Sequence, residues 1–197
     1  MQAPHARHGA YERRTNGLLA PVAGGRAARV VRSFSFVDLC GFTNFVDLNG
    51  DDAALAELSL LRATIRDVAG RHAIRVDKWL GDGAMLVAVE PEPLVSATLR
   101  AAEEHSRRGE LALRAGLASG PVIMCDGDDY IGRPVNLAAR LCDLAGPGQV
   151  LAAVSVDLRL PLDAVALSEG SVTVKGFAGA VAVCGLTGSE AAARLGA

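Results

Sequence analysis

The chain has 197 residues, half of them apolar, and a formal net charge of −2. This length is sufficient for one domain with a substantial core, while no apolar run is as long as a membrane span and no signal-peptide segment begins the chain. The near-neutral charge gives no electrostatic reason for a nucleic acid partner, so we expect a cytoplasmic domain that binds neither membranes nor nucleic acid.

The cysteine pattern indicates a reducing environment. The four cysteines lack the CxxC or CxxH spacing that is typical of zinc sites. We expect them to be reduced and mostly buried, as in a cytosolic protein, rather than joined in disulfides. They are Cys40, Cys125, Cys142 and Cys184.

Residues 1–28 show no regular hydrophobic period, and several arginines are scattered among glycine and proline there. This composition favours a flexible N-terminal extension. An arm that packs on a partner subunit or tunes activity is the alternative. We expect the domain itself to span residues 29–188, and residues 189–197 to form a frayed C-terminal tail.

A strand is predicted over residues 30–39, because side chains of different character alternate along it. Asp38 lies at its end, where a carboxylate can leave the sheet and reach a ligand. Gly41 permits a tight turn, and a helix then begins at Phe42 and Thr43. The first N–H groups of a helix have no partner within it, so they are available to a triphosphate.

This helix is expected to break at residues 47–52, where Asp, Asn and Gly gather. A long helix should follow over residues 53–72. Its predicted core stripe consists of apolar residues three or four positions apart, namely Leu55, Leu58, Leu61, Ile65 and Val68.

Residues 73–79 and 84–89 are predicted to form two strands joined by a turn. Asp-Gly is an ordinary turn pair, so Asp82 alone indicates little. Strand pairing can bring it beside Asp38, however, and two carboxylates there would suit Mg²⁺ or Mn²⁺. Lys78 lies on an otherwise apolar strand and therefore needs a partner, unless it lies at an exposed edge.

A helix is predicted over residues 91–108, followed by strands over residues 111–119 and 122–125 with a Gly-Pro pair between them. The helix residues expected to face inward are Leu94, Ala97, Thr98 and Ala101.

The stretch at residues 126–143 reads DGDDYIGRPVNLAARLCD and begins with an acidic turn. Its proline fits the first turn of a helix. Asn136 and Arg140 lie four residues apart on one helix face, and an amide beside a permanent cation suits an oxygen-rich anion such as a polyphosphate. An ordinary polar surface helix is the alternative. The apolar face consists of Val135, Ala138, Ala139 and Cys142.

The remaining chain is expected to add a short strand over residues 149–154, a short helix over residues 155–160, and a closing hairpin of residues 171–175 and 181–186. Together with the preceding β-α-β-β-α-β order, this pattern indicates an α+β fold. We expect a ferredoxin-like core with a small C-terminal αβ subdomain.

Four stretches resemble, in order, the motifs of the class III nucleotidyl cyclase catalytic domain. DYIGRPVNLAAR, from residue 129, resembles the family signature of an Asp, a Gly and then V-N-x-A-[AS]-R. FVDLCGFT, from residue 36, resembles the first metal-binding motif, and KWLGDG, from residue 78, resembles the second with its preceding Lys. VKG, from residue 174, resembles the late phosphate-binding Lys. Their order and spacing over residues 29–186 make the resemblance specific.

This resemblance implies the groups that would carry out the chemistry. Asp38 and Asp82 would bind two divalent ions, Mg²⁺ or Mn²⁺, with the Leu39 carbonyl as a candidate further ligand. Asn136 would orient the ribose, and Arg140 would stabilise the charge that grows on the α-phosphoryl oxygens.

The resemblance also implies the contacts that recognise the substrate. Lys78 and Asp129 would read the base, because adenine presents an acceptor at N1 and a donor at its 6-amino group, whereas guanine reverses both. The partner molecule would therefore be ATP, with its terminal phosphates on Lys175 and its triphosphate beside the helix start at Phe42 and Thr43. Many family members have a longer hairpin before the Asp and carry a phosphate-binding Arg on it, and no clear equivalent is found in this sequence.

The expected reaction is the conversion of ATP to 3′,5′-cyclic AMP and pyrophosphate. In this family the metal carboxylates and the substrate-reading groups of one site come from opposite subunits, and this chain has both sets, so a homodimer is expected. The alternative is a catalytically silent, cyclase-like regulatory partner. A diguanylate cyclase is disfavoured because the GG[DE]EF turn is absent, and a plain ferredoxin-like binding module would not need Asp38, Asp82 and Arg140 together.

Overall fold

The computed structural model describes residues 29–125, 129–155 and 158–195. The extension predicted over residues 1–28 and the start of the acidic turn at residues 126–128 lie outside them. The described elements are β1 (Arg29–Leu39), α1 (Phe42–Arg71), β2 (Arg75–Leu80), β3 (Gly83–Ala88), α2 (Pro91–Ser106), β4 (Leu113–Cys125), β5 (Asp129–Ile131), α3 (Arg133–Leu144), β6 (Val150–Ala153), β7 (Ala164–Thr173), β8 (Ala180–Gly188) and α4 (Ser189–Leu195).

The strands form one mixed sheet in the order β2-β3-β1-β4-β6-β8-β7, and β5 pairs with β4 outside this path. All pairings are antiparallel except that of β4 with β6. The order β1-α1-β2-β3-α2-β4 is the predicted ferredoxin-like core, and β6, β7, β8 and α4 extend it. The predicted α+β fold is therefore confirmed.

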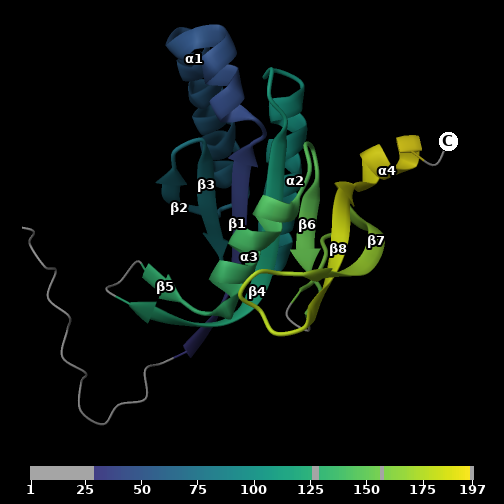
Figure 1. The fold of residues 1–197 in the computed structure, drawn as a ribbon. Helices are drawn as coiled ribbons and strands as arrows, with labels where there is room; N and C mark the ends of the chain where they lie inside the picture. Colours follow the sequence, from purple (N-terminus) through teal and green to yellow (C-terminus); the bar gives the residue numbers. More distant parts are fainter. Residues whose placement is uncertain (1–28, 126–128, 156–157, 196–197) are drawn as a thin grey trace, which may run out of the picture.

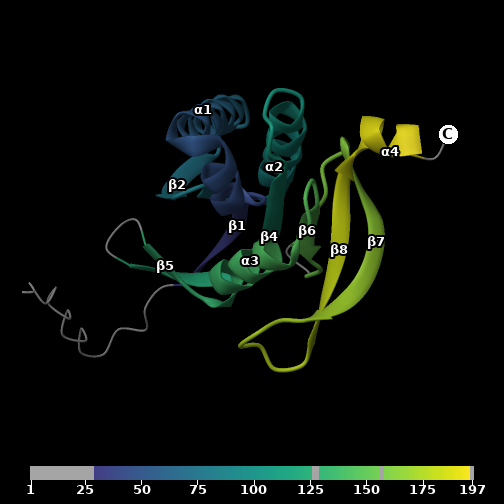
Figure 2. The ribbon, with the colours of Figure 1, turned by 45° about the horizontal axis from the view of Figure 1, so that its top comes forward.

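Helices cover both faces of the sheet, with α1 and α2 on one face and α3 on the other (Figures 1 and 2). We call these the α1/α2 face and the α3 face. Strand β1 contributes to both, because Val37 and Leu39 are buried in the core with α1 and α2, whereas Phe34 is buried in the core with α3. By the same alternation, Asp38 at the end of β1 lies on the α3 face.

Glycine permits the close contact between α3 and β4. A Cβ atom on Gly116 would lie 2.3 Å from the Ala138 carbonyl oxygen and 2.2 Å from the Cys142 nitrogen, which excludes any side chain there. The most deeply buried residues of α3 pack on this part of the sheet. They are Pro134, Leu137, Ala138, Leu141 and Cys142. The exposed face of α3 therefore carries Asn136 and Arg140, as predicted.

The predicted break near the start of α1 is confirmed, since Gly50 has the non-helical angles φ 81° and ψ 174°. The predicted core stripe that follows is wrong at Leu55, which is 64% exposed. The buried side of the helix passes through Ala54 and Glu57 instead. Glu57 is buried because its carboxylate accepts the N–H of Glu110 at 2.8 Å, a contact that hydrophobic periodicity does not reveal.

Two predictions near the C-terminus are also wrong. Residues 155 and 158–160 are not helical, and the proline that follows disfavours helical geometry at residue 160. The tail expected to be frayed contains the short helix α4, which is attached where Ser189 N–H donates to the Asp163 carbonyl oxygen at 2.8 Å.

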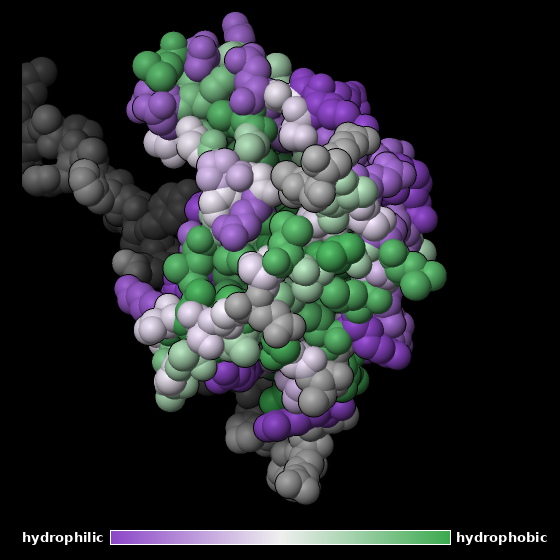
Figure 3. Space-filling view, turned by 90° about the vertical axis from the view of Figure 1, so that its right-hand side faces the viewer, coloured by the Kyte–Doolittle hydropathy of each residue, from purple (hydrophilic) through white to green (hydrophobic). Residues whose placement is uncertain are grey.

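The closing hairpin is confirmed, although β7 begins at residue 164 rather than 171. As an edge strand, β7 lies on a side of the molecule where apolar surface gathers (Figure 3). The exposed apolar residues of this strand and the segment before it are Leu160, Leu162, Val165 and Leu167. No described helix is both long and apolar enough to cross a membrane.

Candidate active site

Two acidic residues meet at the end of β1. Asp38 is opposite Gly83 in the β1–β3 pairing, and Asp82 immediately precedes Gly83 in the turn from β2. The Leu39 N–H donates to the Asp82 carbonyl oxygen at 3.1 Å, which fixes the turn beside the strand end. A Cβ atom on residue 83 would lie 2.5 Å from the Val37 carbonyl oxygen and 3.1 Å from Asp38 Oδ1. Glycine at this position therefore permits the start of β3 to lie close against the end of β1 and the Asp38 side chain.

Arg114 is the partner of Asp38, and sequence reasoning did not single it out. It lies directly across from Asp38 in the β1–β4 pairing, and its Nη2 and Nε are 2.6 and 3.0 Å from Asp38 Oδ2. Burial raises the pKa of Asp38, the Arg114 hydrogen bond lowers it, and the charge of Asp82 raises it again, with a raised pKa as the net result. The feature that could have revealed Arg114 is the register of β1 with β4, because it places this cation opposite the Asp38 carboxylate.

Asp143 connects this acidic end with helix α3. Its carbonyl oxygen accepts from Arg114 Nη1 at 3.3 Å, and its carboxylate Oδ2 lies 3.2 Å from Arg140 Nη1. The predicted catalytic arginine is therefore exposed and held by a carboxylate of its own helix. Asn136 lies one turn earlier on the same exposed face.

The two predicted base-reading residues contact each other. Lys78 Nζ on β2 lies 2.7 Å from Asp129 Oδ1 on β5, although 51 positions separate them in the chain. This hydrogen bond is the main reason why the pKa of Lys78 is raised and that of Asp129 is lowered. The Tyr130 N–H also donates to Asp129 Oδ1, at 3.0 Å. Lys78 thus lies on an exposed edge strand, as the alternative held, and it also has a partner in Asp129.

The remaining predicted residues occupy separate positions. Leu39 has a buried side chain, while Phe42 is half-buried against the core and Thr43 is exposed in the first turn of α1. Lys175 is exposed in the connection between β7 and β8. Within the described residues, no hydrogen bond or ion pair joins Lys175 or Asn136 to the acidic end.

The acidic end fits one kind of metal ion. Across the described ranges, no three His, Cys, Asp or Glu residues are grouped so as to enclose a metal by themselves. Two carboxylates are nevertheless the typical protein contribution to Mg²⁺ sites in which substrate phosphates and water supply the other ligands. Asp38 and Asp82 therefore suit an ion that arrives with a polyphosphate, and Arg114 would have to release Asp38 to admit it.

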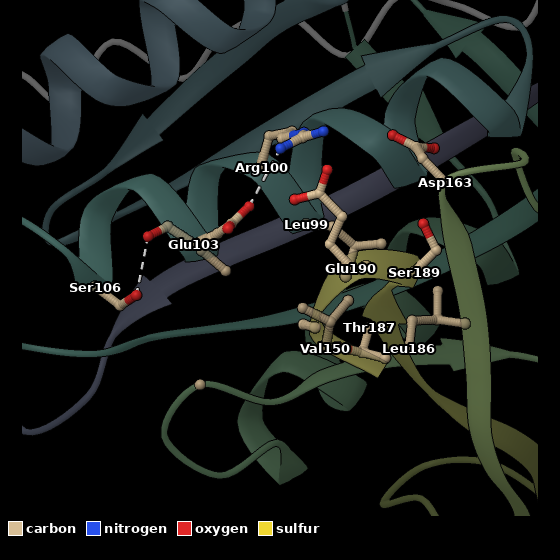
Figure 4. Close-up of a pocket in the computed structure, with 14 residues that line it drawn as sticks. Leu99, Arg100, Glu103, Ser106, Val150, Asp163, Leu186, Thr187, Ser189 and Glu190 are labelled. Atoms are coloured by element: carbon tan, nitrogen blue, oxygen red, sulfur yellow. Dashed lines mark hydrogen bonds and ion pairs between the residues drawn. The ribbon is translucent and has the colours of Figure 1, made fainter. Parts of the chain in front are cut away.

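A pocket of about 280 Å³ lies elsewhere, between α2 and the chain around β8 and α4 (Figure 4). Arg100 and Glu103 line it from α2, and Asp163 and Glu190 from the C-terminal part. None of the predicted site residues lines this pocket. This pocket is therefore separate from the candidate active site, which lies on the α3 face.

Comparisons with known proteins give both sequence relatives and structural neighbours. No family model matches the chain. An uncharacterized protein of Mycobacterium tuberculosis, Rv2212, is 40% identical over 157 residues, which are 79% of this chain and 41% of that protein. A protein of the same species named pH-sensitive adenylate cyclase, MT1302, is 36% identical over 141 residues, which are 69% of this chain and 33% of that protein. The chain thus spans less than half the length of the curated relatives that it matches.

Solved structures give the same fold. The adenylyl cyclase CyaB from P. aeruginosa superimposes with a TM-score of 0.67 at 22% identity, over 81% of this chain and 95% of that chain. The guanylyl cyclase Cya2 superimposes with a TM-score of 0.66 at 17% identity, over 81% of this chain and 93% of that chain. Because one of these neighbours is an adenylyl cyclase and the other a guanylyl cyclase, the structural likeness establishes the fold and does not distinguish ATP from GTP as substrate.

Proposed function

The chain is a class III nucleotidyl cyclase domain by its fold, and from this premise we propose that it converts ATP to 3′,5′-cyclic AMP and pyrophosphate. The observation that supports the proposal is the position of Asp38 at the end of β1, opposite Gly83 and beside the turn that contains Asp82. The two carboxylates would supply oxygen ligands for divalent ions, and Asp38 lies on the sheet face to which Lys78 points. We further propose that the protein acts in the cytoplasm, which suits its four free cysteines.

The proposed reaction depends on position and charge. The ribose 3′-oxygen attacks the α-phosphorus in line, and pyrophosphate leaves on the opposite side. Divalent ions held by Asp38 and Asp82 would lower the pKa of the 3′-hydroxyl and neutralise phosphate charge. Arg140 would bind the α-phosphoryl oxygens as their charge grows, because a guanidinium stays protonated and matches two oxygens at once. Asn136 would orient the ribose.

Two further cations would hold the polyphosphate. Lys175 is exposed and available for the terminal phosphates. Arg114 supplies a permanent cation beside Asp38, so a polyphosphate bound at the acidic end would lie within its reach. It can therefore take the place of the phosphate-binding Arg that the sequence lacks in the hairpin before Asp129.

Adenine suits the Lys78–Asp129 pair. The ammonium of Lys78 can donate to N1, and the carboxylate of Asp129 can accept from the 6-amino group. Guanine would face each group with the wrong partner, and an unpaired buried polar group costs about 1–3 kcal/mol. This complementarity supports ATP over GTP as substrate.

We propose that the working form is a symmetric homodimer with its sites between the subunits. One chain carries the acidic end, and the same chain carries Asn136 and Arg140 exposed on α3. If each site takes its acidic end from one subunit and its α3 residues from the other, the dimer has two complete sites and the monomer has none.

The first test is turnover of ATP and GTP with Mn²⁺ or Mg²⁺, with the product identified by chromatography. We expect cyclic AMP from ATP and much slower turnover of GTP. Nucleotide binding without turnover would instead favour a silent regulatory partner.

The second test separates a shared site from a site within one chain. Asp38→Ala and the double variant Asn136→Ala/Arg140→Ala should each be nearly inactive. After equal mixing and subunit exchange, about half of the dimers are mixed and each has one undamaged site, so activity should return to roughly a quarter of wild type. A mixture of Asp38→Ala with Asp82→Ala is the matched control and should not recover. No recovery in the first mixture, with exchange confirmed by differently tagged subunits, would exclude the shared site.

A further inference from the structure

Asp77 on β2 is an acid that the proposed reaction does not use. Its side chain is only 2% exposed, although β2 is an edge strand of the sheet. One carboxylate oxygen, Oδ2, is buried and has no hydrogen-bond partner within the described residues. A buried polar oxygen without a partner costs stability, so its presence calls for a physical explanation.

Asp77 is the extra residue of a β-bulge. The pairing of β2 with β3 shifts between Val76, opposite Leu86, and Lys78, opposite Met85. Leu86 belongs to the core on the α1/α2 face and Met85 to the core on the α3 face. Without the bulge, Lys78 would follow Val76 by two positions and would point to the same face as Val76. The bulge therefore turns Lys78 to the α3 face, where Asp129 lies.

The Asp77 carboxylate also supports a second contact between β2 and β5. It forms an ion pair with Arg75, whose guanidinium carbon lies 5.7 Å from the centre of the Tyr130 ring and whose Nη2 lies 3.4 Å from the Tyr130 hydroxyl. The N–H of Tyr130 in turn donates to Asp129. β2 and β5 are not hydrogen-bonded to each other as strands, so among the described contacts it is these side chains that join them directly.

We propose that Asp77 is the positioning residue of the Lys78–Asp129 pair. Its bulge directs Lys78 toward Asp129, and its carboxylate holds Arg75 on Tyr130, so that selection between adenine and guanine nucleotides depends on Asp77. The inference rests on the proposed function, because it assigns the pair to a purine nucleoside triphosphate. An exposed ion pair is weak by itself, and a pair that reads a base must be held in its geometry by surrounding groups.

The test compares Asp77→Val and Asp77→Asn with wild type. Val suits a strand and has no polar side-chain atom, so the first variant removes the carboxylate and its hold on Arg75 while it keeps the length of β2. Asn keeps the shape and one acceptor for Arg75, so it should rescue part of the effect. The matched control is Asp67→Asn, which removes the same charge from the exposed surface of α1, where Asp67 pairs with Arg71.

For Asp77→Val, we expect a rise of roughly tenfold in the KM for ATP and a similar fall in the ratio of kcat/KM for ATP to that for GTP, the scale of one lost buried hydrogen bond. The kcat and the Tm should change little. Asp77→Asn should lie between this variant and wild type, and Asp67→Asn should match wild type. In a Lys78→Ala/Asp129→Ala background, Asp77→Val should leave the selectivity unchanged, because Asp77 acts through this pair.

An unchanged ATP to GTP ratio in Asp77→Val, or a parallel loss of kcat and Tm with the ratio intact, would overturn the inference. If Asp77→Val does not fold, Asp77→Asn decides, and a wild-type ratio in that variant counts against Asp77. If the wild-type protein cyclises neither nucleotide, the proposed function fails separately. The inference is then decided by equilibrium dialysis of ATP and GTP, in which the dissociation constants replace KM.

Discussion

Two ion pairs on the α3 face differ in how the fold holds them. Arg114 and Asp38 lie on neighbouring strands that are hydrogen-bonded in register, and their side chains are 28% and 25% exposed. Lys78 and Asp129 lie on strands that are not paired with each other, and their side chains are 44% and 60% exposed. The first pair is built into the sheet, whereas the second depends on the bulge and the Arg75–Tyr130 contact.

The pKa values reflect the same difference. Asp38 has a raised pKa in spite of its arginine, because burial is the largest influence on it. Asp129 has a lowered pKa, because its hydrogen bond with Lys78 outweighs burial. At the acidic end, burial and the charge of Asp82 disfavour the ionised form of Asp38, and a divalent cation bound there would favour it. The exposed Lys78–Asp129 pair, which we call the base end, would be able to open for the edge of a base. We expect changes at the acidic end to act on the rate and changes at the base end to act on selectivity.

The largest expected effect is at the acidic end. Asp38→Ala or Asp82→Ala should abolish turnover, because either change removes one of the two carboxylate ligands proposed for divalent ions. Circular dichroism should show an intact fold, since both residues lie at a strand end or in a turn. Asp67→Ala on α1 is the control and should remain active. Near-normal turnover by either site variant at saturating Mn²⁺ would contradict the assignment of these carboxylates as metal ligands.

The acidic end was largely predictable from the sequence. Asp38 ends a strand with clear alternation, and Asp82 lies in an Asp-Gly turn, so local patterns place both. Arg114 was not predictable in this way, because it lies inside a strand and no motif marks it. Only the register of β1 with β4 opposes it to Asp38, and register depends on contacts between residues 76 positions apart.

A smaller loss of rate is expected at Arg140, the exposed cation on α3. Arg140→Ala should lower kcat by about 10²–10³-fold, by analogy with the loss of one donor from an oxyanion hole, and should change KM much less. Steady-state kinetics with ATP measures this split. Arg100→Ala on α2, where Arg100 lies 3.4 Å from Glu103, is the control. A normal kcat with a raised KM would make Arg140 a group that binds the ground state only.

At the base end, selectivity should change rather than the maximal rate. Lys78→Glu with Asp129→Cys should lower the ATP to GTP ratio of kcat/KM by roughly tenfold or more, since buried hydrogen bonds to the base are lost or mismatched. The stability should change little, because exposed ion pairs contribute roughly 0–1 kcal/mol. Competition between the two nucleotides in one assay reports the ratio directly. A ratio equal to that of wild type would remove both residues from the base site.

The base end was only partly predictable. The sequence motifs identify Lys78 and Asp129 as candidates. Their contact joins the edge strand β2 to the short strand β5, and no local sequence pattern reveals that residues 51 positions apart lie close together. The bulge at Asp77 could not be predicted from the two-residue alternation of a regular strand, because the bulge reverses the face of the sheet to which Lys78 points. In α1, the predicted stripe fails for a related reason, since Glu57 is buried to bind Glu110 rather than to extend an apolar pattern.

The smallest expected effect is that of acidic pH. It should lower the stability of the fold through His105 while it leaves the charges of Lys78 and Asp129 unchanged. His105 is fully buried near the end of α2, with its Nε2 3.3 Å from Glu57 Oε2 on α1. Burial lowers the pKa of His105, the neighbouring Glu57 raises it, and the charge of Arg108 in the following turn lowers it. The net direction is downward. The unfolded chain therefore takes up a proton at a higher pH than the folded chain does.

Between the lowered pKa and 6.5, the ordinary value for histidine, the unfolded state binds more protons, so stability should fall as the pH drops through this window. Urea unfolding at pH 7.5 and 5.5 should show this loss for wild type, and His105→Gln should reduce it. Equal losses in both proteins would exclude His105 as the cause. The ATP to GTP ratio should stay constant over the same range, because the raised pKa of Lys78 and the lowered pKa of Asp129 keep that pair ionised. A ratio that moved with pH would mean that the base end is not the independent, permanently charged pair that its exposure indicates.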